Sequence, residues 1–219
     1  MSIHEFAGRF AAYLAHQLEA DRIKENRMAF GLELLLGEIV KLLCVITLSY
    51  ALGVLPEVLT ITVTAGVLRL ASGGEHCSAY YRCLIGGTLC FLLLGWIAHS
   101  LNPIISREAL MLVVVICFLI VGLVLYKYAP GSHHIFALSV AEEERTKFRK
   151  WSLIIASVYC VVMIIMMQFE TSKILVLPMI IGMIEQAFTI TPWGYSFLHW
   201  VDNVLGAKKE NAKNGYFNC

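Results

Sequence analysis

This sequence of 219 residues is poor in charge: Asp, Glu, Lys and Arg make up 15% of it, while 58% of the residues are hydrophobic. Soluble domains average about 25% charged residues. With a mean hydropathy of +0.73, the chain has more apolar surface than one aqueous core can bury. The composition therefore excludes a soluble globular protein and predicts an integral membrane protein.

The seven cysteines form no CxxC or CxxH pair, which argues against a secreted disulfide scaffold and a cysteine-based metal site. A membrane thiol oxidoreductase using Cys77 and Cys83 is weakly supported, because cytosolic thiols stay reduced. His133 and His134 are adjacent and have no third ligand at suitable spacing, so they do not predict a metal site either. We therefore expect no metal and no cofactor.

Residues 1–30 lack the uninterrupted apolar stretch of a signal peptide ahead of the charged run that begins at Asp21. Apolar residues instead recur at three- and four-residue spacing, which predicts an amphipathic helix in the membrane interface. A helix that packs on the protein itself is the alternative. The recurring residues are Ile3, Phe6, Phe10, Tyr13, Leu14 and Leu18.

Six apolar stretches follow, and each predicts a membrane-spanning helix. The second contains a β-branched run from Thr60 to Thr64, but an isolated strand in lipid would leave its backbone unsatisfied, so a helix is expected. The predicted fold is all-α: a polytopic membrane protein with six transmembrane helices and one domain over residues 1–206, followed by a polar cytosolic tail at 207–219. The spans cover residues 32–53, 55–70, 83–100, 109–126, 151–169 and 174–190.

The predicted outer loops have little positive charge. They hold only Arg107 and Lys173, whereas the segments on the other side hold fourteen Lys and Arg residues. Positive charge collects on the cytoplasmic side, so both termini are expected inside the cell membrane. The same rule places the polar insert at residues 69–83 on the cytoplasmic face. Residues 145–150, a basic cluster, are interpreted as a lipid-headgroup or positive-inside feature.

The insert at residues 69–83 contains a His and a Cys seven residues apart. A thiol within reach of an imidazole can form a thiolate–imidazolium pair, the usual way to activate a cysteine nucleophile. On a straight helix, His76 and Cys83 would be about 10 Å apart. Glycines permit a bend, so Gly73 and Gly74 could fold His76 back over Cys83. From spacing alone, two unrelated polar residues at a membrane surface remain an equal alternative.

Other polar residues in the apolar spans are weighed as partners of this pair. Gln186 and Glu38 are the first candidates to orient His76 or to stabilise an oxyanion. Glu38 can also pair with Lys41, three residues on. Arg82 is interpreted first as reaching towards lipid headgroups, with stabilisation of the thiolate and binding of a substrate carboxylate as the alternatives.

The pattern Arg69-x3-Gly73-Gly74-x-His76-x6-Cys83 resembles the accessory gene regulator B family, membrane endopeptidases that mature cyclic quorum-sensing peptides in Gram-positive bacteria. The segments Lys127-Tyr128-Ala129-Pro130 and Gln186-Ala187-Phe188-Thr189-Ile190-Thr191-Pro192 extend the resemblance over most of the chain. It implies Cys83 as nucleophile, His76 as base, and Arg69 and Gly74 as residues that shape the site. The chain departs from the family after Pro130, where members often carry Asp and further prolines.

The resemblance implies a cysteine endopeptidase that removes the C-terminal tail of a quorum-sensing propeptide and promotes its cyclisation to a thiolactone. The implied partner is a precursor of the AgrD type, with an amphipathic leader and an acidic tail that residues 145–150 could attract. A homodimer is also implied, and no nucleic-acid partner is expected. The alternative is a small membrane peptide transporter, although the chain lacks the paired, Gly/Pro-broken spans that mark transporter sites.

Overall fold

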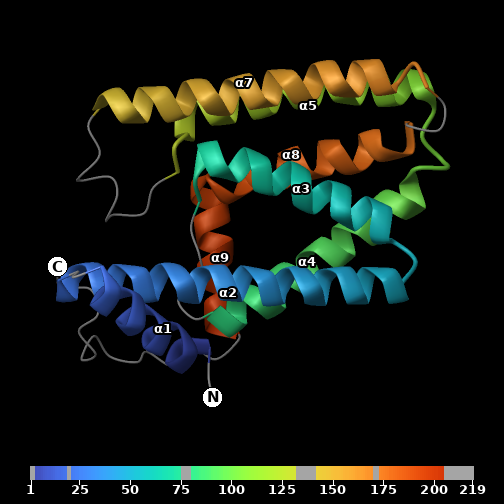
Figure 1. The fold of residues 1–219 in the computed structure, drawn as a ribbon. Helices are drawn as coiled ribbons and strands as arrows, with labels where there is room; N and C mark the ends of the chain where they lie inside the picture. The colour runs from blue at the N-terminus through green and yellow to red at the C-terminus, as the bar shows by residue number, and fades with distance from the viewer. Residues whose placement is uncertain (1–2, 19–20, 75–79, 132–141, 170–172, 205–219) are drawn as a thin grey trace. The chain divides into compact units, whose positions relative to one another are not determined.

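A computed structural model of the protein describes residues 3–18, 21–74, 80–131, 142–169 and 173–204 (Figure 1). Over these ranges every element is helical apart from one backbone bridge between Gly73 and Gly131, so the all-α prediction is confirmed. The elements are α1 (Ile3–Gln17), α2 (Arg22–Ala51), α3 (Leu55–Ser72), α4 (Tyr80–Leu101), α5 (Arg107–Tyr128), α7 (Glu142–Met166), η1 (Lys173–Leu175), α8 (Val176–Thr189) and α9 (Pro192–Val204).

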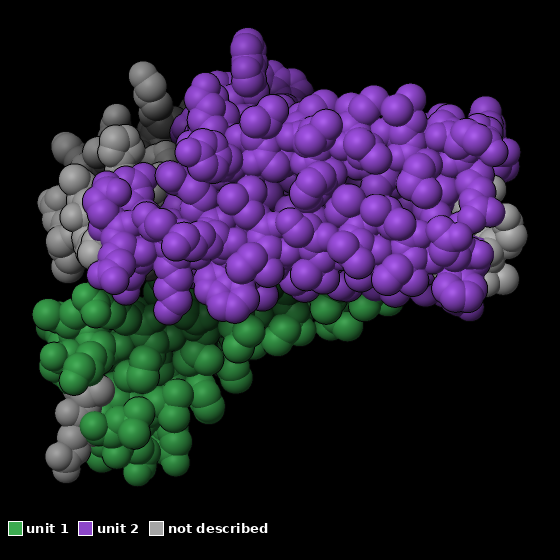
Figure 2. All heavy atoms as spheres, turned by 90° about the horizontal axis from the view of Figure 1, so that it is seen from above, with its two compact units in different colours: residues 1–48 green, residues 49–219 purple. Residues whose placement is uncertain are grey.

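The chain divides into two compact units, residues 1–48 and residues 49–219, which Figure 2 colours separately. The first unit holds α1 and most of α2. Asp21 caps α2, because its carboxylate accepts a hydrogen bond from the backbone N–H of Lys24 at 2.8 Å. The second unit holds α3 to α9 and is the unit that positions the candidate site.

Helix α1 has two unlike faces. Ala7, Ala11 and Ala15, spaced four apart, are buried. Phe6 and Phe10 are exposed, and their rings stack with centroids 6.3 Å apart. An exposed aromatic face suits a helix in a membrane interface, and that location stays a prediction.

Among the described residues, four helices are long and apolar enough to cross a membrane: Leu55–Ser72, Arg82–Leu101, Arg107–Tyr128 and Glu142–Met166. They coincide with the second to fifth predicted spans and support the assignment to a membrane. The first and sixth predicted spans, 32–53 and 174–190, are not among them, so a count of six stays a prediction. Helix α8 has 14 residues, a length of about 21 Å against roughly 30 Å of hydrocarbon in a bilayer.

Helix α8 lies at the centre of the second unit. It contacts α3, α4, α5, α7 and α9, and Figure 1 shows it running beside α3. The contact with α3 is close, because a Cβ on Gly182 would lie 2.8 Å from the carbonyl oxygen of Ile61. A short apolar helix that is surrounded in this way is typical of a core helix. Its buried residues include Val176, Leu177, Met179, Ile180, Met183 and Ala187.

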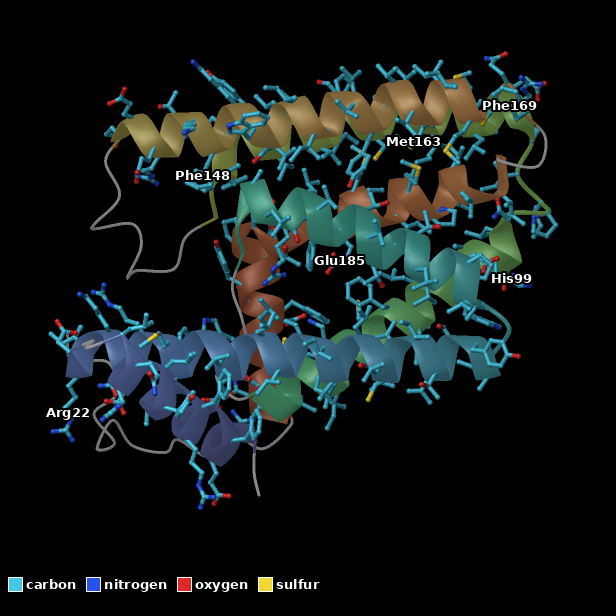
Figure 3. All side chains as sticks on the ribbon, viewed as in Figure 1. Arg22, His99, Phe148, Met163, Phe169 and Glu185 are labelled. Atoms are coloured by element: carbon cyan, nitrogen blue, oxygen red, sulfur yellow. The ribbon has the colours of Figure 1, made fainter. Side chains whose placement is uncertain are left out.

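The core around α8 comes from regularly spaced side chains on its neighbours. Helix α5 buries a residue every three or four positions, as one face of a helix requires. Met163 adds to the core from α7 (Figure 3). The α5 residues are Leu110, Val114, Cys117, Val121 and Leu125.

The β-branched run of the second predicted span is helical, as expected. The hydroxyls of Thr60 and Thr62 donate to backbone carbonyl oxygens four residues earlier, each at 2.7 Å. This back-bonding satisfies the threonine hydroxyls within their own helix, where lipid offers no partner. Pro56 lies in the first turn of α3, where its missing N–H costs no helical hydrogen bond.

Candidate active site

Helix α3 ends in a turn made by two glycines at the start of the polar insert. Gly73 has φ of +69° and Gly74 has φ of +148°, conformations that other residues rarely adopt. The N–H of Gly73 donates to the carbonyl oxygen of Arg69 at 2.9 Å and closes the helix. The bend expected at these glycines is therefore present.

A second backbone segment pairs with this glycine turn. The N–H of Gly131 donates to the carbonyl oxygen of Ser72 at 2.8 Å, and the N–H of Gly74 donates to the carbonyl oxygen of Gly131 at 3.0 Å. The two backbones approach so closely that a Cβ on Gly73 would lie 2.6 Å from the oxygen of Gly131. Sequence reasoning missed Ser72 and Gly131. The Pro-Gly dipeptide at 130–131 was a signal for a turn but not for its partner.

Gln186 holds the glycine turn from α8, where it is fully buried. Its amide nitrogen donates to the carbonyl oxygen of Gly73 at 2.7 Å and to Oγ of Ser72 at 2.8 Å. Its amide oxygen accepts from the hydroxyl of Thr189 at 3.3 Å. An amide nitrogen has two hydrogens to donate, and both have protein partners here. Gln186 thus fixes the turn, while its predicted role towards His76 or an oxyanion stays a prediction.

Arg69 lies one turn before the glycines on α3. A Cβ on Gly74 would lie 3.2 Å from Cζ of Arg69, so the guanidinium packs directly against the turn. Four of the predicted site residues therefore come together: Arg69, Gly73, Gly74 and Gln186.

The segment that carries Gly131 is itself braced by α7 and α9. Nε of Arg149 donates to the carbonyl oxygen of Ala129 at 3.1 Å. A Cβ on Gly131 would lie 3.0 Å from the hydroxyl oxygen of Tyr195. One residue of the basic cluster 145–150 thus contacts the end of α5, so a headgroup role does not describe the whole cluster.

Cys83 lies in the first turn of α4 and is partly buried. His76 and Cys77 lie outside the described residues, and so do His133 and His134. The pairing of Cys83 with His76 therefore stays a prediction. Over the described ranges, no group of three or more His, Cys, Asp or Glu residues could hold a metal ion.

Arg82, next to Cys83, forms an ion pair with Asp202 of α9, with Nη1 and Oδ1 3.7 Å apart. The two side chains are 11% and 12% exposed. The interpretation of Arg82 as a headgroup contact is therefore wrong, because its guanidinium is directed into the protein. Sequence reasoning missed Asp202, although an acidic residue after an aromatic stretch was available as a signal.

Glu38, the acidic candidate, and Glu185, a further acidic residue within a predicted span, lie on two different helices. Glu38 belongs to α2 in the first unit and pairs with Lys41, as the three-residue spacing indicated. Glu185 belongs to α8 and is partly buried. Figure 3 labels Glu185 beside the contact of α8 with α3.

Comparison with known proteins shows which sequences this chain resembles. A sequence profile described as Accessory gene regulator B matches residues 7–190. The Accessory gene regulator protein B of Staphylococcus aureus (strain MRSA252) is 25% identical over 188 residues, which cover 86% of this chain and 94% of that protein. An AgrB-like protein of Halalkalibacterium halodurans is 26% identical over 211 residues, 94% of this chain and 98% of that protein. No solved structure shows a significant match.

Proposed function

Because the match over residues 7–190 shows that this chain belongs to the accessory gene regulator B family, we propose that it is an integral-membrane cysteine endopeptidase. Its substrate is a quorum-sensing propeptide of the AgrD type. The enzyme removes the C-terminal tail of that propeptide and promotes closure of the remaining peptide to a thiolactone.

The observation that carries this proposal is the fixed glycine turn at the end of α3. Its backbone is held by Gln186 on one side and by Gly131 on the other. His76 follows the turn by two residues, and Cys83 follows in the first turn of α4. A defined start to this segment supports a catalytic pair, because a nucleophile and its base must be held within hydrogen-bond reach.

The proposed reaction runs through a thioester on Cys83. His76 takes the proton of the thiol, and the thiolate attacks the carbonyl carbon of the scissile peptide bond. The C–N bond then breaks, and the imidazolium protonates the leaving amine. His76, now neutral, next takes the proton of the precursor's own cysteine, whose thiolate attacks the acyl-thioester. The acyl group moves to that sulfur, the C–S bond to Cys83 breaks, and His76 returns the proton to the Cys83 thiolate. Excluding water favours ring closure over hydrolysis of the thioester.

The other predicted site residues receive supporting roles in this scheme. Arg69 shapes the turn and presents a cation beside it, while Gly73 and Gly74 supply backbone that another residue would strain. Gln186 orients the turn, and Glu38 remains a candidate orienting carboxylate. The scheme also retains six spans, an interfacial N-terminal helix, a homodimer, both termini in the cytosol and a catalytic site at the cytoplasmic face.

Cleavage of a candidate precursor of the AgrD type tests this proposal. Membranes that contain wild type, Cys83→Ala, His76→Ala or Cys77→Ala protein are incubated with that precursor, and the products are followed by mass spectrometry. We expect cleavage to be lost in the first two variants and kept in the third. Cleavage by Cys83→Ala would overturn the peptidase. Retained peptide export by Cys83→Ser, without cleavage by any variant, would instead favour the transporter.

A further inference from the structure

Helix α9 lies beyond the residues that the family profile matches, and it contacts both α4 and α8. Its start is fixed tightly on the end of α8. The N–H of Gly194 donates to the hydroxyl of Thr191 at 3.2 Å, and a Cβ on Gly194 would lie 2.2 Å from the carbonyl oxygen of Phe188. The direction in which α9 leaves α8 is therefore constrained by close backbone packing.

One face of α9 reaches two separate parts of the candidate site. Tyr195 and Asp202 are seven residues apart, so they share a face and are separated by about 10 Å along the helix. Tyr195 lies against Gly131, which pairs with the glycine turn that leads to His76. Asp202 forms the ion pair with Arg82, next to Cys83 in the chain.

Helix α9 packs closely on α4 in addition to forming the ion pair between Asp202 and Arg82. A Cβ on Gly86 would lie 3.2 Å from Cγ1 of Val201, so the helices meet beside the ion pair. Both partners of that pair are nearly buried. Breaking one half of a buried pair leaves an uncompensated charge, whereas replacing both halves with apolar groups is often tolerated.

We propose that α9 fixes the first turn of α4 relative to the glycine turn, and that Asp202, acting through Arg82, is a positioning residue for Cys83. This inference rests on the proposed peptidase function, since Cys83 needs a fixed position only if it reacts. Asp202 touches no reacting atom in this scheme. Its effect is on how often the Cys83 thiolate is correctly placed, and a misplacement of 1 Å can lower a rate by about 100-fold.

The test uses the full-length protein in membranes and two readouts. The first is kcat and KM for precursor cleavage, and the second is hydrogen exchange of the amides in residues 80–90. We expect Asp202→Ala to lower kcat by about 10- to 100-fold with little change in KM, and to speed exchange in the first turn of α4. Asp202→Glu, which keeps the carboxylate, should retain most of the rate. Glu142→Ala is the matched control, because Glu142 also pairs with an arginine but is 92% exposed.

The double variant Arg82→Met/Asp202→Leu separates positioning from a direct role of the arginine. If Arg82 acts only by holding α4, the apolar pair should recover kcat and slow exchange relative to either single variant. A double variant as inactive as Arg82→Met would overturn the proposal, because it would assign the charge of Arg82 to the substrate or to the thiolate. Asp202→Ala that matches Glu142→Ala in both readouts would also overturn it.

The two readouts also keep this inference distinct from the proposed function. If wild type cleaves no precursor, but Asp202→Ala still speeds hydrogen exchange at residues 80–90 and the double variant slows it again, then α9 fixes the first turn of α4 as proposed. In that case the peptidase function fails. If cleavage depends on Cys83 and His76 but is indifferent to Asp202, the peptidase stands and the positioning role is wrong.

Discussion

The side-chain amide nitrogen of Gln186 lies 2.7 Å from the carbonyl oxygen of Gly73 and joins residues 113 positions apart in the sequence. This contact links the buried helix α8 to the backbone turn that precedes His76. It makes the interior of the unit and the geometry of the candidate site dependent on each other.

Replacing Gln186 with leucine tests that dependence. The change removes two donated hydrogen bonds at a fully buried position, which should cost about 1–3 kcal/mol per unsatisfied group. We expect a lower unfolding temperature in detergent and slower precursor cleavage. Gln168→Leu is the control, because its amide also donates to a carbonyl oxygen, that of Ile164, but from the exposed turn that follows α7. Equal behaviour of the two variants would contradict the role of Gln186.

Gly73→Ala should disable the turn. An alanine there would adopt φ near +69° and place its Cβ 2.6 Å from the oxygen of Gly131, and such backbone strain costs about 1–3 kcal/mol. We expect Gly73→Ala to lower both the rate of precursor cleavage and the unfolding temperature. Gly66→Ala on the same helix meets nothing within 4 Å and should be neutral or slightly stabilising. Cleavage rates and thermal unfolding of the two proteins provide the comparison.

Gly182→Val should separate α8 from α3. A Cβ at this position would lie 2.8 Å from the carbonyl oxygen of Ile61 and 3.0 Å from Cβ of Thr64, and overpacking a core contact costs about 1–3 kcal/mol. Thermal unfolding in detergent should show the loss. Gly122→Val, at a position in α5 with nothing within 4 Å, should be much milder, and a reversed order would refute the close packing of α3 on α8.

The side-chain contact between Glu57 and His99, at the start of α3, should make the effects of mutating the two residues on stability depend on each other. Oε1 of Glu57 lies 2.8 Å from Nδ1 of His99, and the Glu57 side chain is only 3% exposed. Its other carboxylate oxygen has no hydrogen-bond partner among the described residues. We expect His99→Ala to lower the unfolding temperature more than Glu57→Leu/His99→Ala, because the single change strands a buried carboxylate. Additive effects would show that the pair contributes little.

The proposed orientation, with both termini in the cytosol, predicts that cysteines at opposite ends of the spans differ in their reaction with a membrane-impermeant reagent. Ile104→Cys, between α4 and α5, should react with a membrane-impermeant maleimide in intact cells. Glu142→Cys, at the start of α7, should react only after the membrane is permeabilised. Ile104 is 76% exposed and Glu142 is similarly open, so access through the protein does not limit either reaction. Labelling in the reverse order would invert the assigned topology.

The sequence predicted the long apolar helices α3, α4, α5 and α7 better than the short helix α8. The spans at 55–70, 83–100, 109–126 and 151–169 are long apolar stretches, and length with composition suffices to identify them. The stretch at 174–190 has the same composition, but α8 is short and packed among other helices. Composition alone does not distinguish an apolar side chain that faces lipid from one that faces another helix.

Within the candidate site, local patterns were predictable and long-range partners were not. The glycine pair predicted a bend, because glycine adopts positive φ. Gln186 was a candidate site residue because a polar residue in an apolar span is costly. Gly131 and Asp202 find their partners only through the packing of whole helices. The error at Arg82 has the same origin, since a basic residue near a span end reaches for headgroups only when no carboxylate is packed beside it.

Gly182 and Gln186 are one turn apart on α8, and both meet α3. Sliding α8 along α3 by a single turn would break both contacts together, so the two helices have one permitted register. If the chain acts on peptides as proposed, its site therefore cannot be enlarged for a bulkier peptide by sliding α8 along α3. Adaptation to a different precursor has to come from the connecting segments and from the helices around this fixed axis.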